Sequence, residues 1–210
     1  MSIFGIFFAP IPRPLWSEYS GVPFVRCIDC EVPLLEANAY LIQKKFVAGE
    51  AIFEMAMCER CRDRMAQAYS EETRRNIIAY MAEQFCRNAA ADTEGDEGEE
   101  PRVVEISEIE DPEEGARMLR RCLDYCLMCG TERKKCHRYS LAGLCRDNEV
   151  VAQVTPVSQT PVMVCDKCEQ GMDNLISQQT RDSWDRFVEE HFDGPPGVES
   201  DVPGSYPMVF

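Results

Sequence analysis

Eight of the twelve cysteines stand in four Cys-x-x-Cys pairs, a spacing typical of thiolate ligands for a metal ion. Such a turn holds two sulfurs close enough to share one metal, and two turns that are distant in sequence must supply a set of four. Four thiolates arranged as a tetrahedron suit Zn²⁺. The pairs are Cys27/Cys30, Cys58/Cys61, Cys126/Cys129 and Cys165/Cys168. We therefore predict two zinc ions per chain, one bound by the first two pairs and one by the last two.

The stretch that follows the second pair of each set occurs twice in the chain. Phe85 follows Cys61 by 24 residues, and Phe192 follows Cys168 by 24 residues. Aligned without a gap, the two stretches share both cysteines and six further residues. These are Met65/Met172, Ser70/Ser177, Thr73/Thr180, Arg74/Arg181, Glu83/Glu190 and Phe85/Phe192. The sequence therefore describes two related cysteine modules.

Each module is predicted to contain a β-hairpin between its two cysteine pairs. In the first module, residues 39–47 and 50–57 are rich in strand formers and flank a glycine-containing turn. In the second module, residues 149–157 and 161–165 are predicted to pair with each other. Each hairpin would carry the chain back to its first cysteine pair.

After the second pair of each module the pattern becomes helical, with apolar residues four apart on one face. The two stripes are Ile77/Met81/Phe85 and Trp184/Val188/Phe192. Ser70 and Ser177 are predicted N-caps, because a serine oxygen can accept a free backbone N–H of the next turn. Two short helices with a joint at the serine are therefore expected. A small module cannot cover its own stripe, so we expect the stripes to meet across a pseudo-two-fold interface.

The order of cysteine pair, hairpin, second pair and helix resembles that of a treble-clef zinc finger. The resemblance covers residues 24–86 and 122–192, and the four cysteine pairs carry it. It implies an α+β fold made of two repeated zinc modules. A plain zinc ribbon is the nearest alternative, but the helical stretch after each second pair counts against it. Treble clefs include ribosomal, nucleic-acid-binding and protein-binding members, so the resemblance does not determine function.

Other chemistry for these cysteines is less consistent with the spacing. Iron–sulfur clusters usually take three cysteines from one loop, and a thioredoxin-like dithiol needs a single pair on a βαβ unit. Two complete sets of four indicate closed structural sites, because a catalytic zinc keeps a position for water. No phosphate loop or nucleophile elbow is present, and we predict that the chain is not an enzyme.

Four cysteines stand outside the pairs: Cys86, Cys122, Cys136 and Cys145. Twelve is three times four, so a third metal site is an alternative, with Cys122 as a substitute ligand. No second Cys-x-x-Cys turn accompanies these residues, however. We therefore predict that they serve in packing, where a free thiol behaves as a small hydrophobe.

The formal net charge of −15 is concentrated between and after the modules. Residues 87–121 carry 12 acidic and 5 basic side chains, and much of this stretch cannot bury enough apolar surface to become ordered. The start of the chain is apolar but lacks the basic residue of a signal peptide, and we predict a cytoplasmic protein without a membrane span. The predicted organisation is an apolar Pro-rich arm (1–23), a first zinc module (24–86), an acidic linker ending in a short helix (87–121), a second zinc module (122–192) and a Pro-rich tail (193–210).

Three functions are consistent with these patterns. The first is a non-enzymatic protein-interaction or regulatory module whose partner is another protein. The second is a nucleic-acid-binding protein that uses basic patches at Lys44-Lys45 and Arg133-Lys134-Lys135. The acidic balance disfavours this second function, since binding to a phosphate backbone depends on basic surface. The third is a thiol-based redox sensor that uses the unpaired cysteines.

Overall fold

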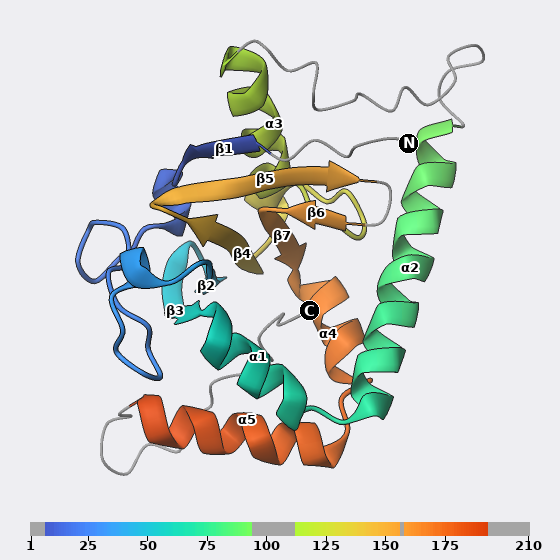
Figure 1. Cartoon of the computed structure of the whole chain (residues 1–210). Helices are drawn as coiled ribbons and strands as arrows, with labels where there is room; N and C mark the ends of the chain where they lie inside the picture. Colours follow the sequence, from blue (N-terminus) through green and yellow to red (C-terminus); the bar gives the residue numbers. More distant parts are fainter. Residues whose placement is uncertain (1–6, 94–111, 156–157, 193–210) are drawn as a thin grey trace, which may run out of the picture.

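Strands from both halves of the chain pair in one antiparallel sheet (Figure 1). The structure is a computed structural model that describes residues 7–93, 112–155 and 158–192. Within these residues the strand order is β1-β5-β4-β2-β3, with β6 beside β5 and β7 beside β4. The strands are β1 (Phe7–Pro10), β2 (Tyr40–Val47), β3 (Glu50–Cys58), β4 (Arg138–Arg146), β5 (Glu149–Thr155), β6 (Ser158–Thr160) and β7 (Val162–Cys165).

Five α-helices lie around the sheet in the described parts of the chain (Figure 1). They are α1 (Glu59–Ala68), α2 (Glu71–Thr93), α3 (Pro112–Asp124), α4 (Asp166–Asp173) and α5 (Gln178–His191). Short 3₁₀ turns are η1 (Arg13–Leu15), η2 (Leu34–Glu36) and η4 (Arg133–Lys135). An antiparallel sheet with helices is the predicted α+β class.

Two tight turns between neighbouring strands have a local cause, and the first of them, at Ala48-Gly49, was predicted. Ala48 and Gly49 have φ of 52° and 86°, and Asp147 and Asn148 have φ of 50° and 65°. Two successive residues with positive φ make the turn whose twist matches that of the flanking strands, and Gly, Asn and Asp adopt this conformation most easily. The β2–β3 hairpin is therefore confirmed.

The hairpin predicted for the second module is wrong in its pairing. β5 pairs with β6, while β7 pairs with β4 and not with β5. The strand β4 was not predicted, because Gly143 and Cys145 interrupt its pattern of strand formers. The additional β5–β6 hairpin takes up the residues by which the second module is longer, so β4 occupies the place that β2 has in the first module.

The pairing between β2 and β4 is symmetric with respect to the two modules. Counted from the first cysteine of each module, Tyr139 is the counterpart of Tyr40, and Cys145 is the counterpart of Phe46. Tyr40 lies opposite Cys145, and Phe46 lies opposite Tyr139, so the β2–β4 pairing is unchanged when the modules are exchanged. Tyr40 also lies opposite Cys58 in the same way that Tyr139 lies opposite Cys165.

The helices α2 and α5 begin directly after Ser70 and Ser177, the two predicted N-caps. Ser70 separates α1 from α2, and its hydroxyl accepts the backbone N–H of Thr73 at 3.1 Å. Ser177 caps α5 by accepting the N–H of Thr180 at 3.3 Å. α2 continues through Thr93, past the predicted module end at 86. The remaining residues predicted as disordered linker, and the tail, lie outside the described residues.

Buried side chains of both modules form a shared core, but the two stripes do not line up along each other. α2 and α5 start close together and diverge (Figure 1). Trp184 and Phe192 of the second module pack instead on Phe53 of β3, with ring centroids 5.9 and 4.9 Å apart. The predicted alignment of the two stripes is therefore not confirmed, although Ile77, Trp184 and Val188 belong to one buried core. The side chain of Phe85 lies outside the described part of the chain.

α2 of the first module likewise contacts the second module, because its Tyr80 packs against Gly171 of α4. Alanine is normally favoured over glycine inside a helix by about 1 kcal/mol. At Gly171, however, a Cβ atom would collide with the Tyr80 hydroxyl and ring. We therefore expect Gly171→Ala to destabilise the protein by about 1–3 kcal/mol, as overpacking does. In a Tyr80→Ala background the same change should become neutral or stabilising. Urea unfolding of the four variants measures this reversal, and an unchanged cost in that background would contradict the packing.

Candidate metal centres

The structure brings the eight predicted cysteines together as two groups of four. In each group the four Sγ atoms lie within 4.8 Å of one another. The first group is Cys27, Cys30, Cys58 and Cys61, and the second is Cys126, Cys129, Cys165 and Cys168. Four convergent thiol sulfurs without a carboxylate or imidazole suit a tetrahedral, thiophilic ion such as Zn²⁺.

Each first pair lies on a tight turn that the backbone builds in the same way. Glu31 and Gly130, the residues after Cys30 and Cys129, have φ of 57° and 67°. The N–H of Glu31 donates to the carbonyl of Cys27 at 3.0 Å, and that of Gly130 donates to the carbonyl of Cys126 at 2.8 Å. The positive φ suits glycine and strains glutamate, so the turn of the second group has the more favourable residue.

Backbone hydrogen bonds hold this turn against the strand that leads to the second cysteine pair, β3 in the first module and β7 in the second. Ile28 N–H donates to the carbonyl of Ala56 at 2.9 Å, and Leu127 N–H donates to the carbonyl of Met163 at 2.8 Å. The sulfur of the first cysteine of each group also accepts a backbone N–H. Cys58 donates to Cys27 Sγ at 3.3 Å, and Cys165 donates to Cys126 Sγ at 3.4 Å. Such bonds favour the thiolate form that a metal requires.

The second pair of each group stands at the N-terminus of a helix. Cys58 is the N-cap of α1, and Cys165 is the N-cap of α4. The positive end of each helix dipole therefore lies at the sulfurs, where it stabilises negative charge. The predicted change from strand to helix at the second pair is thus part of the site.

Without a metal, protons divide unequally among the sulfurs. The backbone N–H of Val32 lowers the pKa of Cys30 to about 6, and hydrogen bonds from Cys165 and Cys168 lower that of Cys126 to about 4. Burial raises the pKa of Cys61, and the hydrogen bond to Cys126 raises that of Cys168. A bound metal ion would have to displace the protons of the latter thiols, so affinity should fall with falling pH.

A charged shell surrounds the first group. Arg64 of α1 donates to Cys61 Sγ at 3.4 Å and also to the carboxylate of Asp29. Burial favours the neutral form of Asp29, but the hydrogen bonds from Arg64 and Cys61 and the charges of Arg64 and His191 together outweigh it and lower the pKa of this carboxyl. His191, at the end of α5, places Nε2 at 3.7 Å from Asp29. The second module thus contributes to the surroundings of the first cysteine group.

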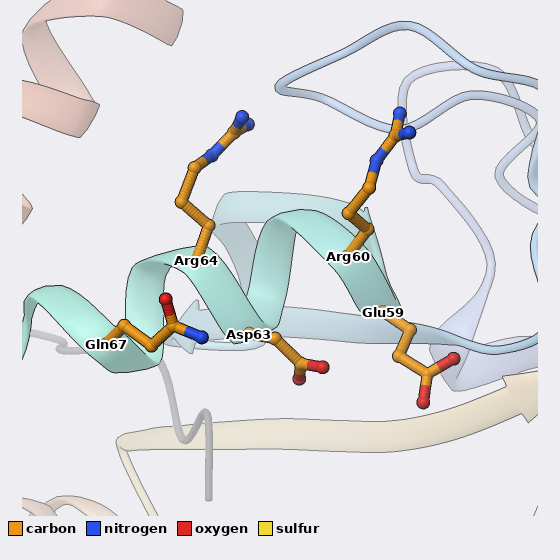
Figure 2. A pocket seen from close by; sticks show the side chains of 5 residues that line it. All are labelled: Glu59, Arg60, Asp63, Arg64 and Gln67. Carbon is orange, nitrogen blue, oxygen red and sulfur yellow. The ribbon is translucent and has the colours of Figure 1, made fainter.

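A surface hollow of about 490 Å³ runs along the outer face of α1. In Figure 2, Arg60 and Arg64 project to one side of the helix, and Glu59 and Asp63 project to the other. Gln67 completes the lining. These residues carry charges of both signs and include no hydroxyl or thiol nucleophile.

Three of the four remaining cysteines have described side chains, and none joins either group. Cys122 and Cys145 are buried, and burial raises the pKa of their thiols to about 11 and about 12. Cys136 is partly buried, and burial also raises its pKa. Among the described residues, no third group of ligands is found. Packing is therefore the role that these surroundings favour, and the side chain of Cys86 lies outside the described part.

The basic patch predicted at Lys44-Lys45 is wrong. Both lysines are buried, with 0% and 4% of their surface exposed. Lys44 Nζ lies 2.9 Å from Glu18 and 3.5 Å from Glu54, and it donates to the carbonyl of Trp16. Because carboxylates from distant segments surround it, this charge cannot reach a nucleic acid.

The patch at Arg133-Lys134-Lys135 is largely neutralised by its neighbours. Arg133 pairs with Asp124 at 2.6 Å. Lys134 and Lys135 are exposed but lie 3.9 and 3.7 Å from Glu132. A nucleic-acid surface would need several free cations on one face, and the burial of Lys44 and Lys45 removes two of the five predicted cations.

An acidic pair was missed by the sequence reasoning. Glu169 of α4 is 6% exposed and meets Lys45 at 3.4 Å. Burial, followed by the charge of Glu169, raises the pKa of nearby Asp173 to about 7. A usable signal existed, because Glu169 and Asp173 replace Arg62 and Ala66 of the first module.

The raised pKa of Asp173 makes stability depend on pH. The unfolded state loses this proton near pH 3.8, whereas the folded state keeps it up to about pH 7. The free energy of unfolding therefore falls between about pH 4 and about pH 7 because of Asp173, and this contribution is constant above pH 7. We expect Asp173→Asn to stabilise the protein by about 1–2 kcal/mol at pH 8 and by less at pH 5.5. Urea unfolding of both proteins at the two pH values measures this, and an equal gain at both would contradict the assignment.

Comparison with known proteins identifies no relative: no family model, no curated protein and no solved structure matches the chain. Among the helices that the structure describes, none combines the length and hydrophobicity needed to cross a bilayer.

Proposed function

We propose that the chain is a non-enzymatic protein-interaction module, built from two treble-clef-like units that each hold one structural Zn²⁺. The two closed groups of four sulfurs support this proposal best. A set of four protein thiolates completes the tetrahedron of zinc and leaves no position for water or substrate. The matching sheet registers support two copies of one unit, related by a pseudo-two-fold axis between Gln43 and Ala142.

Elemental analysis tests the metal part of this proposal. Protein purified without added metal should contain two zinc ions per chain and no iron. One zinc, three zincs or a predominance of iron would each reject it. The measurement needs no knowledge of the partner.

An exposed apolar groove beside the first cysteine pair supports a protein partner. Its volume is about 370 Å³, and it is lined by Val22, Pro23, Phe24, Val25, Arg26, Pro33, Leu35 and Asn148. Val25 and Leu35 are 69% and 63% exposed, and Val22 is 49% exposed. Large apolar side chains gathered in this way favour a protein ligand over water. The partner we propose inserts a short apolar segment here.

Affinity purification from the native host tests the groove. We expect a partner that the natural chain captures and that Val25→Asp/Leu35→Asp does not. Ile78→Asp is the matched control, because Ile78 is an equally exposed apolar residue, at 60%, on α2. Both variants should retain their zinc, which shows that the fold is intact. Equal capture by the groove variant and the control would reject this surface.

A further inference from the structure

The two modules meet through equivalent surfaces. At the start of α2 and α5, Ser70 Oγ lies 2.8 Å from Ser177 Oγ. Ser70 N–H donates to Thr180 Oγ1 at 3.1 Å, and Ser177 N–H donates to Thr73 Oγ1 at 2.9 Å. These contacts are reciprocal, as is the β2–β4 pairing. An interface made of like surfaces can also form between like halves of two molecules, as in a symmetric homodimer.

One buried contact across the interface is not reciprocal. Lys45 of β2 in the first module meets Glu169 of α4 in the second, with Nζ 3.4 Å from Oε2. Both side chains are less than 10% exposed. The hydroxyl of Ser140, which lies opposite Lys45 in the sheet, donates to the other oxygen of Glu169 at 2.9 Å. The pair is therefore desolvated and held between the modules.

The counterparts of this pair have different charges. Lys45 corresponds to Leu144, and Glu169 corresponds to Arg62. Two first modules joined in the same way would place Lys45 against Arg62 of the other copy, a buried repulsion. Two second modules would place Glu169 against Leu144, a buried carboxylate without its cation. Either arrangement leaves a desolvated charge uncompensated, which costs far more than an exposed one.

We propose that the Lys45–Glu169 pair selects the pairing of the first module with the second and excludes the pairing of like modules between two copies of the chain. The reciprocal contacts would stabilise the first–second, first–first and second–second pairings alike. The ion pair supplies the difference between them, since specificity is a difference of affinities and a repulsive element in the wrong complex increases it. This inference rests on the sheet and the buried charges, and it does not depend on the partner proposed above.

A cleavable form of the full chain tests the proposal. A protease site is placed between residues 94 and 111, and the zinc-loaded protein is cleaved after folding. The natural halves should remain a 1:1 complex in size-exclusion chromatography with light scattering. Lys45→Glu and Glu169→Lys should each weaken this complex at least about 30-fold, because a buried charge loses its partner. The combined Lys45→Glu/Glu169→Lys chain should recover it.

The combined variant distinguishes recognition from misfolding. Each substitution alone should weaken the complex, so recovery on combining them shows that the two charges recognise each other. Lys135→Glu, at an exposed ion pair, is the control and should change nothing. Undiminished association of the single variants, or a combined variant no better than either, would overturn the proposal.

A gain of association gives a second, independent readout. Arg62→Glu places an acid where Lys45 of another copy would meet it, so that two first modules become compatible. After unfolding and refolding of the cleaved chain with zinc, we expect cross-linked first–first dimers from this variant and none from the natural sequence. Arg62→Gln removes only the repulsion and should give fewer. First–first dimers in equal amount from the natural chain would reject the selection.

Discussion

Cys58→Ser is expected to leave one zinc per chain and to unfold most of the protein. Zinc bound by four cysteines contributes an apparent 10–16 kcal/mol, about as much as the whole stability of a typical domain. Cys58 also caps α1, and its module supplies β3 and the neighbouring strand β2, which pairs with β4 of the second module. The loss should therefore spread beyond the first module. Elemental analysis and thermal unfolding followed by circular dichroism measure both effects.

Cys136→Ser is the matched control for this substitution, since Cys136 is partly buried but belongs to neither group. It should keep two zinc ions and nearly the natural melting temperature. Cys165→Ser should behave like Cys58→Ser, because the second group is built in the same way. Two zinc ions retained after either ligand substitution would contradict the assignment of ligands.

Trp184→Ala should lower the free energy of unfolding by about 3–5 kcal/mol, the usual cost of deleting a buried aromatic side chain. Trp184 is 2% exposed and contacts Phe53 of the first module and Phe187 of its own helix, the latter at 5.3 Å. Because the contact crosses between the modules, both should lose stability together. Trp184→Phe keeps much of the packing and should cost less.

Trp16, the other tryptophan of the chain, reports on the unfolding of the first module in this variant. The chain has two tryptophans, so Trp184→Ala leaves Trp16 as the fluorescent reporter. Trp16 lies in the arm, where its carbonyl accepts from Lys44 of β2. We expect the Trp16 transition to shift to lower denaturant together with the signal of the whole chain. A Trp16 transition at the natural midpoint would show that the modules unfold independently.

Local features of the fold could be predicted from the sequence. The hairpin at Ala48-Gly49 and the caps at Ser70 and Ser177 depend on a few neighbouring residues, and all three are confirmed. The cysteine groups could also be predicted, because four ligands must converge whatever the route of the chain.

Features that depend on distant partners could not be predicted. The burial of Lys44 and Lys45 requires carboxylates from the arm, β3 and α4, and nothing beside the lysines indicates them. The contacts of α2 with the second module and of α5 with the first depend on which apolar surfaces fit together. Periodicity shows that a stripe must be covered, but not by what.

The packing of Trp184 and Phe192 on Phe53 has a consequence for how the chain is made. Phe53 leaves the ribosome long before its aromatic cover, and translation at about 5–20 residues per second implies a delay on the order of ten seconds. During that time the apolar face of the first module around Phe53 stays uncovered. Contacts so distant in sequence also slow folding after release. A nascent chain stalled before α5 should therefore bind hydrophobic-peptide chaperones, and one extended past Phe192 should not.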